Sequence, residues 1–112
     1  MVADVGHHDQ EILADCARRL AGLTALLVGV RCPIATIMER RNASPEGAYL
    51  TGSIESPPAP VRRWQEAVHR PGIYDLEIDT SSSSPLECAA AIAARLASGP
   101  PIAFRRLEAR SP

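Results

Sequence analysis

Near the start of the chain, His7-His8-Asp9 forms a cluster of side chains that can bind metal ions. Imidazole and carboxylate groups are common zinc ligands. Adjacent histidines nevertheless lack the i,i+4 spacing that places two ligands on one face of a helix. A metal site here would need a further ligand from elsewhere in the fold, and we therefore expect ordinary loop residues without a metal.

Polar side chains also follow two stretches of the sequence that are predicted to be strands, one continuously apolar and one alternating. Arg31 comes directly after Thr24-Ala-Leu-Leu-Val-Gly-Val30, and Thr80 and Ser81 come directly after Ile73-Tyr-Asp-Leu-Glu-Ile-Asp79. If both stretches are parallel strands, these residues lie at the carboxyl edge of the sheet, where ligands of open α/β proteins bind. Arg31 is then either structural or part of that crevice. The hydroxyls could contact a ligand, but a Ser-rich loop before a capped helix explains them equally well.

The basic residues exclude several chemistries, because all 12 are arginine and none is lysine. The chain therefore has no lysine for a Schiff base, for an amine general base or for the phosphate-binding loop G-x-x-x-x-G-K-[S/T]. A formal charge of −1 argues against a nucleic-acid partner, since such proteins usually carry an excess of basic residues. With one Phe, two Tyr and one Trp, a platform for stacking bases is not expected either.

The cysteines and the apolar runs indicate a cytoplasmic protein. Cys16, Cys32 and Cys88 are odd in number and form no C-x-x-C pair, which predicts reduced and mostly buried thiols. The longest apolar run, residues 25–30, is far shorter than the roughly 20 residues that span a bilayer. No basic region precedes an apolar stretch at the N-terminus, so we expect neither a signal peptide nor a membrane partner.

The periodicity of apolar residues predicts alternating strands and helices in one small domain over residues 1–99. Alternation of this kind implies an α/β fold with about three parallel strands and right-handed crossovers. Ser84-Pro85-Leu86-Glu87 predicts a capped helix start, because it combines an N-cap Ser, a Pro at the first position and a Glu three residues after the cap. We expect strands over 2–5, 24–30 and 73–79, helices over 9–20, 34–41, 61–69 and 84–98, a lid or loop over 43–60, and an irregular tail over 100–112.

Several blocks of the sequence occur in the order found in a known family. They are Leu27-Val-Gly-Val-Arg-Cys-Pro33, Arg40, Trp64-Gln65, Val68-His69, Tyr74-Asp-Leu-Glu-Ile-Asp-Thr80 and Ser84-Pro-Leu-Glu-Cys-Ala89. Together they resemble the C-terminal half of chloramphenicol phosphotransferases, over about residues 1–97. The resemblance implies part of a three-layer P-loop kinase fold. It also implies transfer of the γ-phosphate of ATP to a hydroxyl of a small molecule, with ATP and Mg²⁺ as cofactors.

The resemblance implies roles for individual residues. Asp4 matches an acidic residue near the magnesium ion, although an ordinary aspartate at a strand end fits its position too. Arg40 matches the arginine that opens the lid, where a planar guanidinium can stack on adenine or reach a phosphate; a solvated arginine on a helix is the alternative. Arg41 is a second candidate beside it. Thr80 and Ser81 match the loop next to the adenine ring.

The sequence also departs from the family. The P-loop strand, the G-x-x-x-x-G-K-[S/T] loop and the catalytic base would all precede Met1. The second lid arginine is replaced by Asn42-Ala-Ser-Pro-Glu46, and Arg62 and Arg63 are possible substitutes. We expect a truncated C-terminal portion that is inactive alone, because phosphoryl transfer needs P-loop amides, lysine and metal together. The alternatives are a non-catalytic module that self-associates through an exposed sheet edge, and assembly with a separate P-loop chain.

Overall fold

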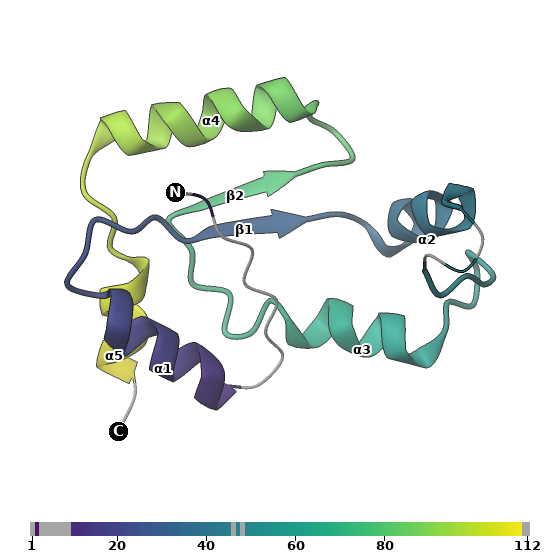
Figure 1. Ribbon diagram of the computed structural model, residues 1–112, viewed down its shortest axis with the longest axis horizontal. Coiled ribbons are helices and arrows are strands. Elements are labelled where there is room, and N and C mark those ends of the chain that lie inside the picture. Colours follow the sequence, from purple (N-terminus) through teal and green to yellow (C-terminus); the bar gives the residue numbers. More distant parts are fainter. Residues whose placement is uncertain (1, 3–9, 46, 48, 111–112) are drawn as a thin grey trace.

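The computed structural model describes residues 2, 10–45, 47 and 49–110 (Figure 1). Over these ranges the chain forms five helices and a two-stranded parallel sheet. The α/β class and the parallel pairing are confirmed. Of the roughly three strands expected, two are present in the described part of the chain. The strand expected over residues 2–5 lies outside it apart from Val2, as do Asp4 and the cluster His7-His8-Asp9.

The elements follow the predicted order up to the end of the capped helix. The two strands are four residues long, so both are shorter than the apolar stretches that predict them. None of the described helices is long and apolar enough to cross a membrane. The elements are α1 (Gln10–Leu20), β1 (Val28–Arg31), α2 (Ile34–Ala43), α3 (Ala59–Ala67), β2 (Leu76–Asp79), α4 (Pro85–Ser98) and α5 (Ala103–Arg110).

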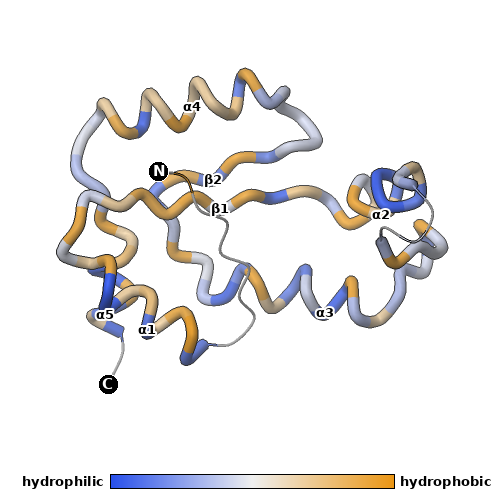
Figure 2. Tube along the Cα trace, in the orientation of Figure 1, coloured by the Kyte–Doolittle hydropathy of each residue, from blue (hydrophilic) through white to orange (hydrophobic). Residues whose placement is uncertain are grey.

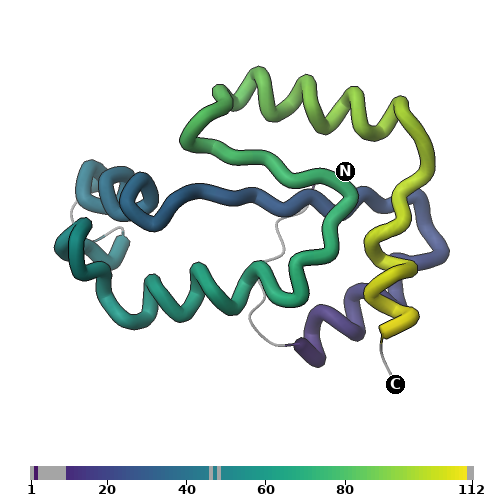
Figure 3. Tube along the Cα trace, turned by 180° about the vertical axis from the view of Figure 1, so that it is seen from behind, coloured from purple at the N-terminus to yellow at the C-terminus, as the bar shows by residue number. Residues whose placement is uncertain are grey.

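The sheet is formed by segments far apart in the sequence. Val28 pairs with Leu76 and Val30 with Ile78 in the parallel register. In both views of the chain, α4 runs beside β2, whereas α2 lies beyond the carboxyl end of β1 and α1 and α5 lie near the opposite end (Figures 1 and 3). The continuously apolar run over residues 25–30 predicts a strand in the middle of a parallel sheet, covered on both faces. In the described residues, however, β1 pairs on one edge only, and Val30 is 55% exposed.

The main hydrophobic core lies between α1 and α5, at the amino end of the strands. Apolar residues of α1 recur at the spacing that places them on one face of a helix, and α5 packs against that face. The radius of gyration is 15.6 Å, compared with about 13 Å for a compact domain of this length. The fold is therefore open, with its core displaced from the sheet. The buried residues of this core are Leu13, Ala17, Ala21, Phe104 and Leu107.

The prediction of an irregular tail over residues 100–112 is wrong for Ala103–Arg110, because these residues form α5. This helix has eight residues, too few to show a clear period in the sequence. It is stabilised by tertiary contacts, because Ala103, Phe104 and Leu107 are buried. Arg105 also reaches α1, where its Nε donates a hydrogen bond to the carbonyl oxygen of Ala21 at 3.2 Å.

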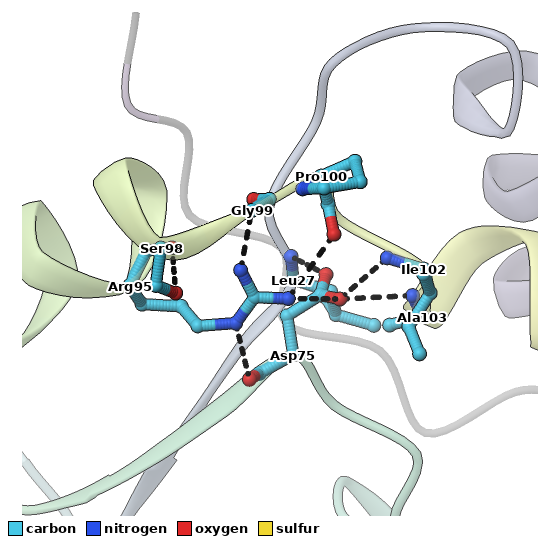
Figure 4. Close-up of polar contacts among 8 residues, drawn as sticks. All are labelled: Leu27, Asp75, Arg95, Ser98, Gly99, Pro100, Ile102 and Ala103. Carbon is cyan, nitrogen blue, oxygen red and sulfur yellow. Dashed lines mark hydrogen bonds and ion pairs between the residues drawn. The ribbon is translucent and has the colours of Figure 1, made fainter.

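A buried carboxylate, that of Asp75, joins both strands to the last helix (Figure 4). One oxygen accepts hydrogen bonds from the backbone N–H groups of Ile102 (2.7 Å) and Ala103 (3.0 Å), and the other accepts from Leu27 N–H at 2.9 Å. The side chain is fully buried, and Nη2 of Arg95 lies 3.6 Å from Oδ1. Asp75 thus satisfies amide donors at the start of α5 that would otherwise have no acceptor.

The guanidinium of Arg95 completes this network from α4. Its Nε donates to the carbonyl oxygen of Asp75 at 3.2 Å, and its two terminal nitrogens donate to Gly99 (3.0 Å) and Pro100 (3.3 Å). These bonds satisfy carbonyl groups at the end of α4. Because arginine presents several donors in a fixed plane, one side chain connects the helix end, the following turn and β2.

The start of α4 is the capping box that the sequence predicts. Ser84 Oγ accepts from Glu87 N–H at 3.1 Å, and Glu87 Oε1 accepts from Ser84 N–H at 3.0 Å. Pro85 occupies the first helical position. The two reciprocal bonds satisfy backbone donors that the helix itself cannot. The bond from Ser84 N–H to the Glu87 carboxylate, followed by the interaction with the Ser84 hydroxyl, lowers the pKa of the Glu87 carboxyl.

A tyrosine ring packs directly on the backbone of β1. A Cβ atom added at Gly29 would lie 2.6 Å from Cδ2 and Cε2 of Tyr74, so only glycine fits beneath this ring. The Tyr74 hydroxyl forms a hydrogen bond of 2.6 Å with His69 Nδ1, and the Arg31 guanidinium lies 5.9 Å from the ring centroid. Burial raises the pKa of the Tyr74 hydroxyl. His69, which the family resemblance singles out, therefore positions Tyr74.

We predict that Asp75→Ala destabilises the fold by about 3–5 kcal/mol, the usual cost of removing one partner from a buried charge pair. The change leaves Arg95 without its buried counter-ion and three amide groups without their acceptor. The free energy of unfolding in urea measures the loss. Asp15→Ala is the matched control, because the Asp15 side chain is 50% exposed and pairs with Arg18 and Arg19 at the surface. An equal loss of unfolding free energy in Asp75→Ala and Asp15→Ala would show that the buried Asp75 network does not stabilise the fold more than a surface ion pair does.

We also predict that Gly29→Ala destabilises the fold by about 1–3 kcal/mol, the usual range for overpacking. The new methyl group would overlap the Tyr74 ring. Gly22→Ala serves as the control, because nothing lies within 4 Å of a Cβ added there. Thermal unfolding of both variants tests the prediction, and a Gly29→Ala variant as stable as Gly22→Ala would refute the close packing.

Candidate functional site

Two predicted residues, Arg40 and Thr80, are in direct contact at the carboxyl ends of the strands. Arg40 Nη1 donates to the Thr80 hydroxyl at 2.9 Å, and Nη2 donates to the Thr80 carbonyl oxygen at 2.6 Å. Nη1 also lies 3.7 Å from Cys32 Sγ. Cys32 follows β1, Thr80 follows β2 and Arg40 lies on α2. One guanidinium therefore joins three elements at the sheet edge where ligands of parallel sheets bind.

Ser81 contacts the last residue of β2. Its backbone N–H (2.8 Å) and its hydroxyl (2.6 Å) both donate to Asp79 Oδ1. These two bonds hold the pKa of the Asp79 carboxyl below its ordinary value of 3.8, with a smaller contribution from the positive charge of Arg40. Thr80 and Ser81 thus belong to one polar cluster, with Thr80 paired to a cation and Ser81 to a carboxylate.

Arg41 lies close to two aromatic rings. Its Cζ is 5.5 Å from the centroid of Tyr49 and 5.8 Å from that of Trp64. Contacts of this kind between a guanidinium and an aromatic face are attractive. They orient the Arg41 side chain toward Trp64 on α3 and toward Tyr49 in the loop after α2. The adjacent arginines of α2 therefore have different partners, since Arg40 bonds Thr80.

The two arginines border one hollow at the surface. Its volume is about 260 Å³. Small-molecule sites commonly measure about 300–1,000 Å³, so this hollow suits one ring or one phosphate group rather than an entire nucleotide. The combination of guanidinium, hydroxyl and aromatic groups favours a planar or anionic ligand. The hollow is lined by Cys32, Ile37, Arg40, Arg41, Ser44 and Tyr49.

Two amide side chains position the surroundings of the hollow. Gln65 Nε2 on α3 donates to the Cys32 carbonyl oxygen at 2.8 Å. Asn42 makes two bonds with the backbone of Gly52, donating to its oxygen (2.9 Å) and accepting from its nitrogen (3.1 Å). Asn42 stands where the family resemblance implies the start of a second arginine-bearing stretch. Here it attaches the loop to α2; closure of this loop as a lid stays a prediction.

Other sequence candidates lie away from this cluster. Arg31 forms an ion pair of 2.7 Å with Glu77, which supports its structural interpretation. Arg63 borders a different hollow of about 410 Å³ on α3, apart from the hollow beside Arg40. That Arg62 or Arg63 replaces the second lid arginine stays a prediction. Asp4 lies outside the described residues, so its magnesium role stays a prediction.

The described residues hold no group of three histidine, cysteine or carboxylate side chains that could bind a metal. Cys16, Cys32 and Cys88 are free, as the sequence predicts. Cys88 is buried, whereas Cys16 and Cys32 are only partly so.

Sequence reasoning missed four residues of the site: Cys32, Tyr49, Asp79 and Gln65. Cys32 and Asp79 could have been found, because each flanks the carboxyl end of an apolar stretch, as Arg31 and Thr80 do. Gln65 belongs to a block shared with the family, but its spacing does not reveal its bond to Cys32, the residue after β1. Tyr49 lies in a stretch without periodicity, where the sequence carries no signal of its contact with Arg41.

We predict that Ser81→Ala raises the pKa of the Asp79 carboxyl toward its ordinary value, because the strongest of its hydrogen bonds is lost. Ser82→Ala should leave this pKa unchanged, since the Ser82 hydroxyl faces the Asp79 backbone oxygen. NMR titration of the carboxyl carbon measures both values. A lowered pKa stabilises the fold above the ordinary value of 3.8, and this contribution is lost as the pH falls through the lowered value. An Asp79 carboxyl with the same pKa in the wild type and in Ser81→Ala would show that the Ser81 hydroxyl does not lower this pKa.

Comparison with known proteins gives one family. The family described as chloramphenicol phosphotransferase-like protein matches residues 1–97, which include α1, both strands, α2, α3 and nearly all of α4. Searches of curated proteins and of solved structures give no significant match. The family match covers far more than half of the 112 residues and ends before α5. The chain therefore belongs to the chloramphenicol phosphotransferase-like family.

Proposed function

We propose that this chain is the C-terminal portion of an ATP-dependent small-molecule O-phosphotransferase, and that it is inactive alone. The contact that carries the proposal is the Arg40 guanidinium, which joins Thr80 and Cys32 at the carboxyl edge of the sheet. Family membership supports a phosphotransferase relationship. The polar cluster lies at the carboxyl ends of the strands, which is the edge where open parallel sheets bind their ligands.

In this proposal Arg40 and Arg41 have different tasks. The terminal nitrogens of Arg40 already donate to Thr80, so Arg40 holds the edge together and contributes charge rather than a free pair of donors. Arg41 and Tyr49 border the hollow and offer a cation and an aromatic face. We assign them to contact the adenine ring or a phosphate of ATP. ATP supplies the phosphoryl group, and Mg²⁺ neutralises charge on its oxygens.

The size of the hollow explains why the chain needs a further part. A volume of about 260 Å³ holds only a fraction of a nucleotide. The G-x-x-x-x-G-K-[S/T] loop that cradles the remaining phosphates is missing from the sequence, which has no lysine at all. Phosphoryl transfer depends on positioning and charge neutralisation by these groups together. The chain can therefore contribute to such a site but cannot complete it.

A second candidate function is a non-catalytic module that binds another copy or a partner. The observation that favours it is the open sheet: in the described residues β1 pairs on one edge only. Two strands are too few to form an independently stable sheet without further packing. An unpaired edge is also a template for another strand.

We predict that this chain does not phosphorylate chloramphenicol above background when supplied with ATP and Mg²⁺, because the phosphate-binding loop is missing. Radiolabelled ATP with product chromatography measures the reaction, and a parallel sample with EDTA defines the background. Robust phosphorylation that EDTA abolishes would overturn the inactivity.

The DNA upstream of Met1 gives an independent check of the parent enzyme. An in-frame G-x-x-x-x-G-K-[S/T] on a preceding strand would support the phosphotransferase portion. An in-frame stop close upstream would favour the binding module or assembly with a separate P-loop chain.

A further inference from the structure

A second hollow of the surface lies beside α3, apart from the hollow that Arg40 borders. Its volume is about 410 Å³, within the range of about 300–1,000 Å³ that is usual for small-molecule sites. Figure 2 shows hydrophilic and hydrophobic segments alternating along α3, as expected of a helix with one buried and one exposed face. We call this hollow the α3 hollow; the described residues that line it are Arg63, Trp64, Glu66, Ala67 and Arg70.

The backbone that carries the α3 hollow is attached to the rest of the fold by its other contacts. Val61, near the start of α3, is buried. Gln65 Nε2 donates to the Cys32 carbonyl oxygen at 2.8 Å, so the inner face of α3 is tied to the end of β1. The Arg70 carbonyl oxygen accepts a hydrogen bond of 3.0 Å from Gln10 Nε2 at the start of α1. The segment is therefore held along its length, and its outer side chains project from a fixed backbone.

Two guanidinium groups give the α3 hollow a net positive charge. Glu66 follows Arg63 by three residues and precedes Arg70 by four, a spacing that places the three side chains on one face. Arg70 Nη2 lies 3.9 Å from Glu66 Oε2, and these side chains are 70% and 71% exposed. An ion pair as exposed as this contributes little. Within the described part of the chain, the Arg63 guanidinium makes no ion pair and no hydrogen bond, so its donors are available to an anion.

Trp64 gives the α3 hollow an aromatic side chain. It is the single tryptophan of the chain, and it is 46% exposed. The Arg41 guanidinium, 5.8 Å from the ring centroid, orients the indole ring. Nearly half of the side chain still faces solvent, where a planar ligand can stack on it or meet its edge. The small side chain of Ala67, one turn after Arg63, leaves room for that ligand.

We propose that the α3 hollow binds an aromatic anion, a small molecule in which a ring carries a phosphate or carboxylate group. The ring contacts Trp64, and the anionic group accepts hydrogen bonds from Arg63. The carboxylate of Glu66 repels the same anion and thereby limits the affinity. The proposal does not rest on the phosphotransferase function, because the α3 hollow shares no lining residue with the hollow beside Arg40.

The test is a titration of the chain with phenyl phosphate, without ATP or Mg²⁺, followed by the fluorescence of Trp64. The wild type should bind saturably, with a dissociation constant of about 1 mM or tighter. Inorganic phosphate lacks the ring and benzyl alcohol lacks the charge, so each should compete at least about tenfold more weakly. A response that does not saturate would overturn the proposal, and so would inorganic phosphate that competes as well as phenyl phosphate.

Variants locate the ligand through the sign of the charge that they remove. Arg63→Gln should weaken binding about tenfold, since it removes the main anion contact. Arg62→Gln is the matched control, because it removes the same charge one residue away and Arg62 lines neither hollow; it should change the affinity by no more than about twofold. Glu66→Gln should tighten binding, because it removes the like charge. Circular dichroism confirms that each variant keeps its helix content.

Three results from the variants would overturn the proposal. Equal weakening by Arg62→Gln and Arg63→Gln would mean that phenyl phosphate responds only to the overall charge of the helix. Weaker binding in Glu66→Gln would show that the ligand anion does not lie beside this carboxylate. Tyr49→Leu alters only the smaller hollow; binding that is lost in Tyr49→Leu and kept in Arg63→Gln would place the ligand there instead, and would leave the proposed nucleotide contacts of that hollow standing.

Discussion

The carboxylate of Asp75 is the interaction on which the rest of this fold depends. Burying a charge is costly unless it is paired and hydrogen-bonded, and here three backbone amides and Arg95 meet that requirement. The same bonds connect the start of β1, β2, the end of α4 and the start of α5. The α1–α5 core can therefore lie beside the strands, because a polar junction attaches it to them.

A second polar junction lies at the opposite end of the sheet. Arg40 connects Cys32, Thr80 and α2 there, much as Arg95 connects α4 to Asp75. Both use the planar guanidinium to satisfy several acceptors at once, which an ammonium group could not do with the same geometry. Basic residues that are all arginine can therefore supply polar junctions to a two-stranded sheet that has little hydrophobic core of its own. The candidate site is a by-product of this second junction, since holding the edge together also gathers positive charge there.

The sequence predicts those parts of the molecule that local patterns control. The parallel α/β order, the Ser84 capping box and the placement of Thr80 at the carboxyl edge all follow from periodicity, cap residues and strand ends. The structure places Arg40 beside Thr80, although the nucleotide roles of both residues stay predictions. Contacts between distant segments could not be predicted: Asp75 looks like one polar residue of an alternating strand, and α5 is too short to show a period. The contact between Arg41 and Tyr49 is set by the path of an irregular loop.

The register of the sheet has a consequence for how the chain folds. Leu27 and Asp75, which join the strands at their amino ends, are 48 residues apart in sequence. Bringing them together carries the entropy cost of closing a long loop, whereas helices form from local contacts. The sheet and both polar junctions therefore belong to the late steps of folding. Interactions that form late act mainly on the rate of unfolding, so the Asp75 junction governs how long the folded chain persists more than how quickly it is reached.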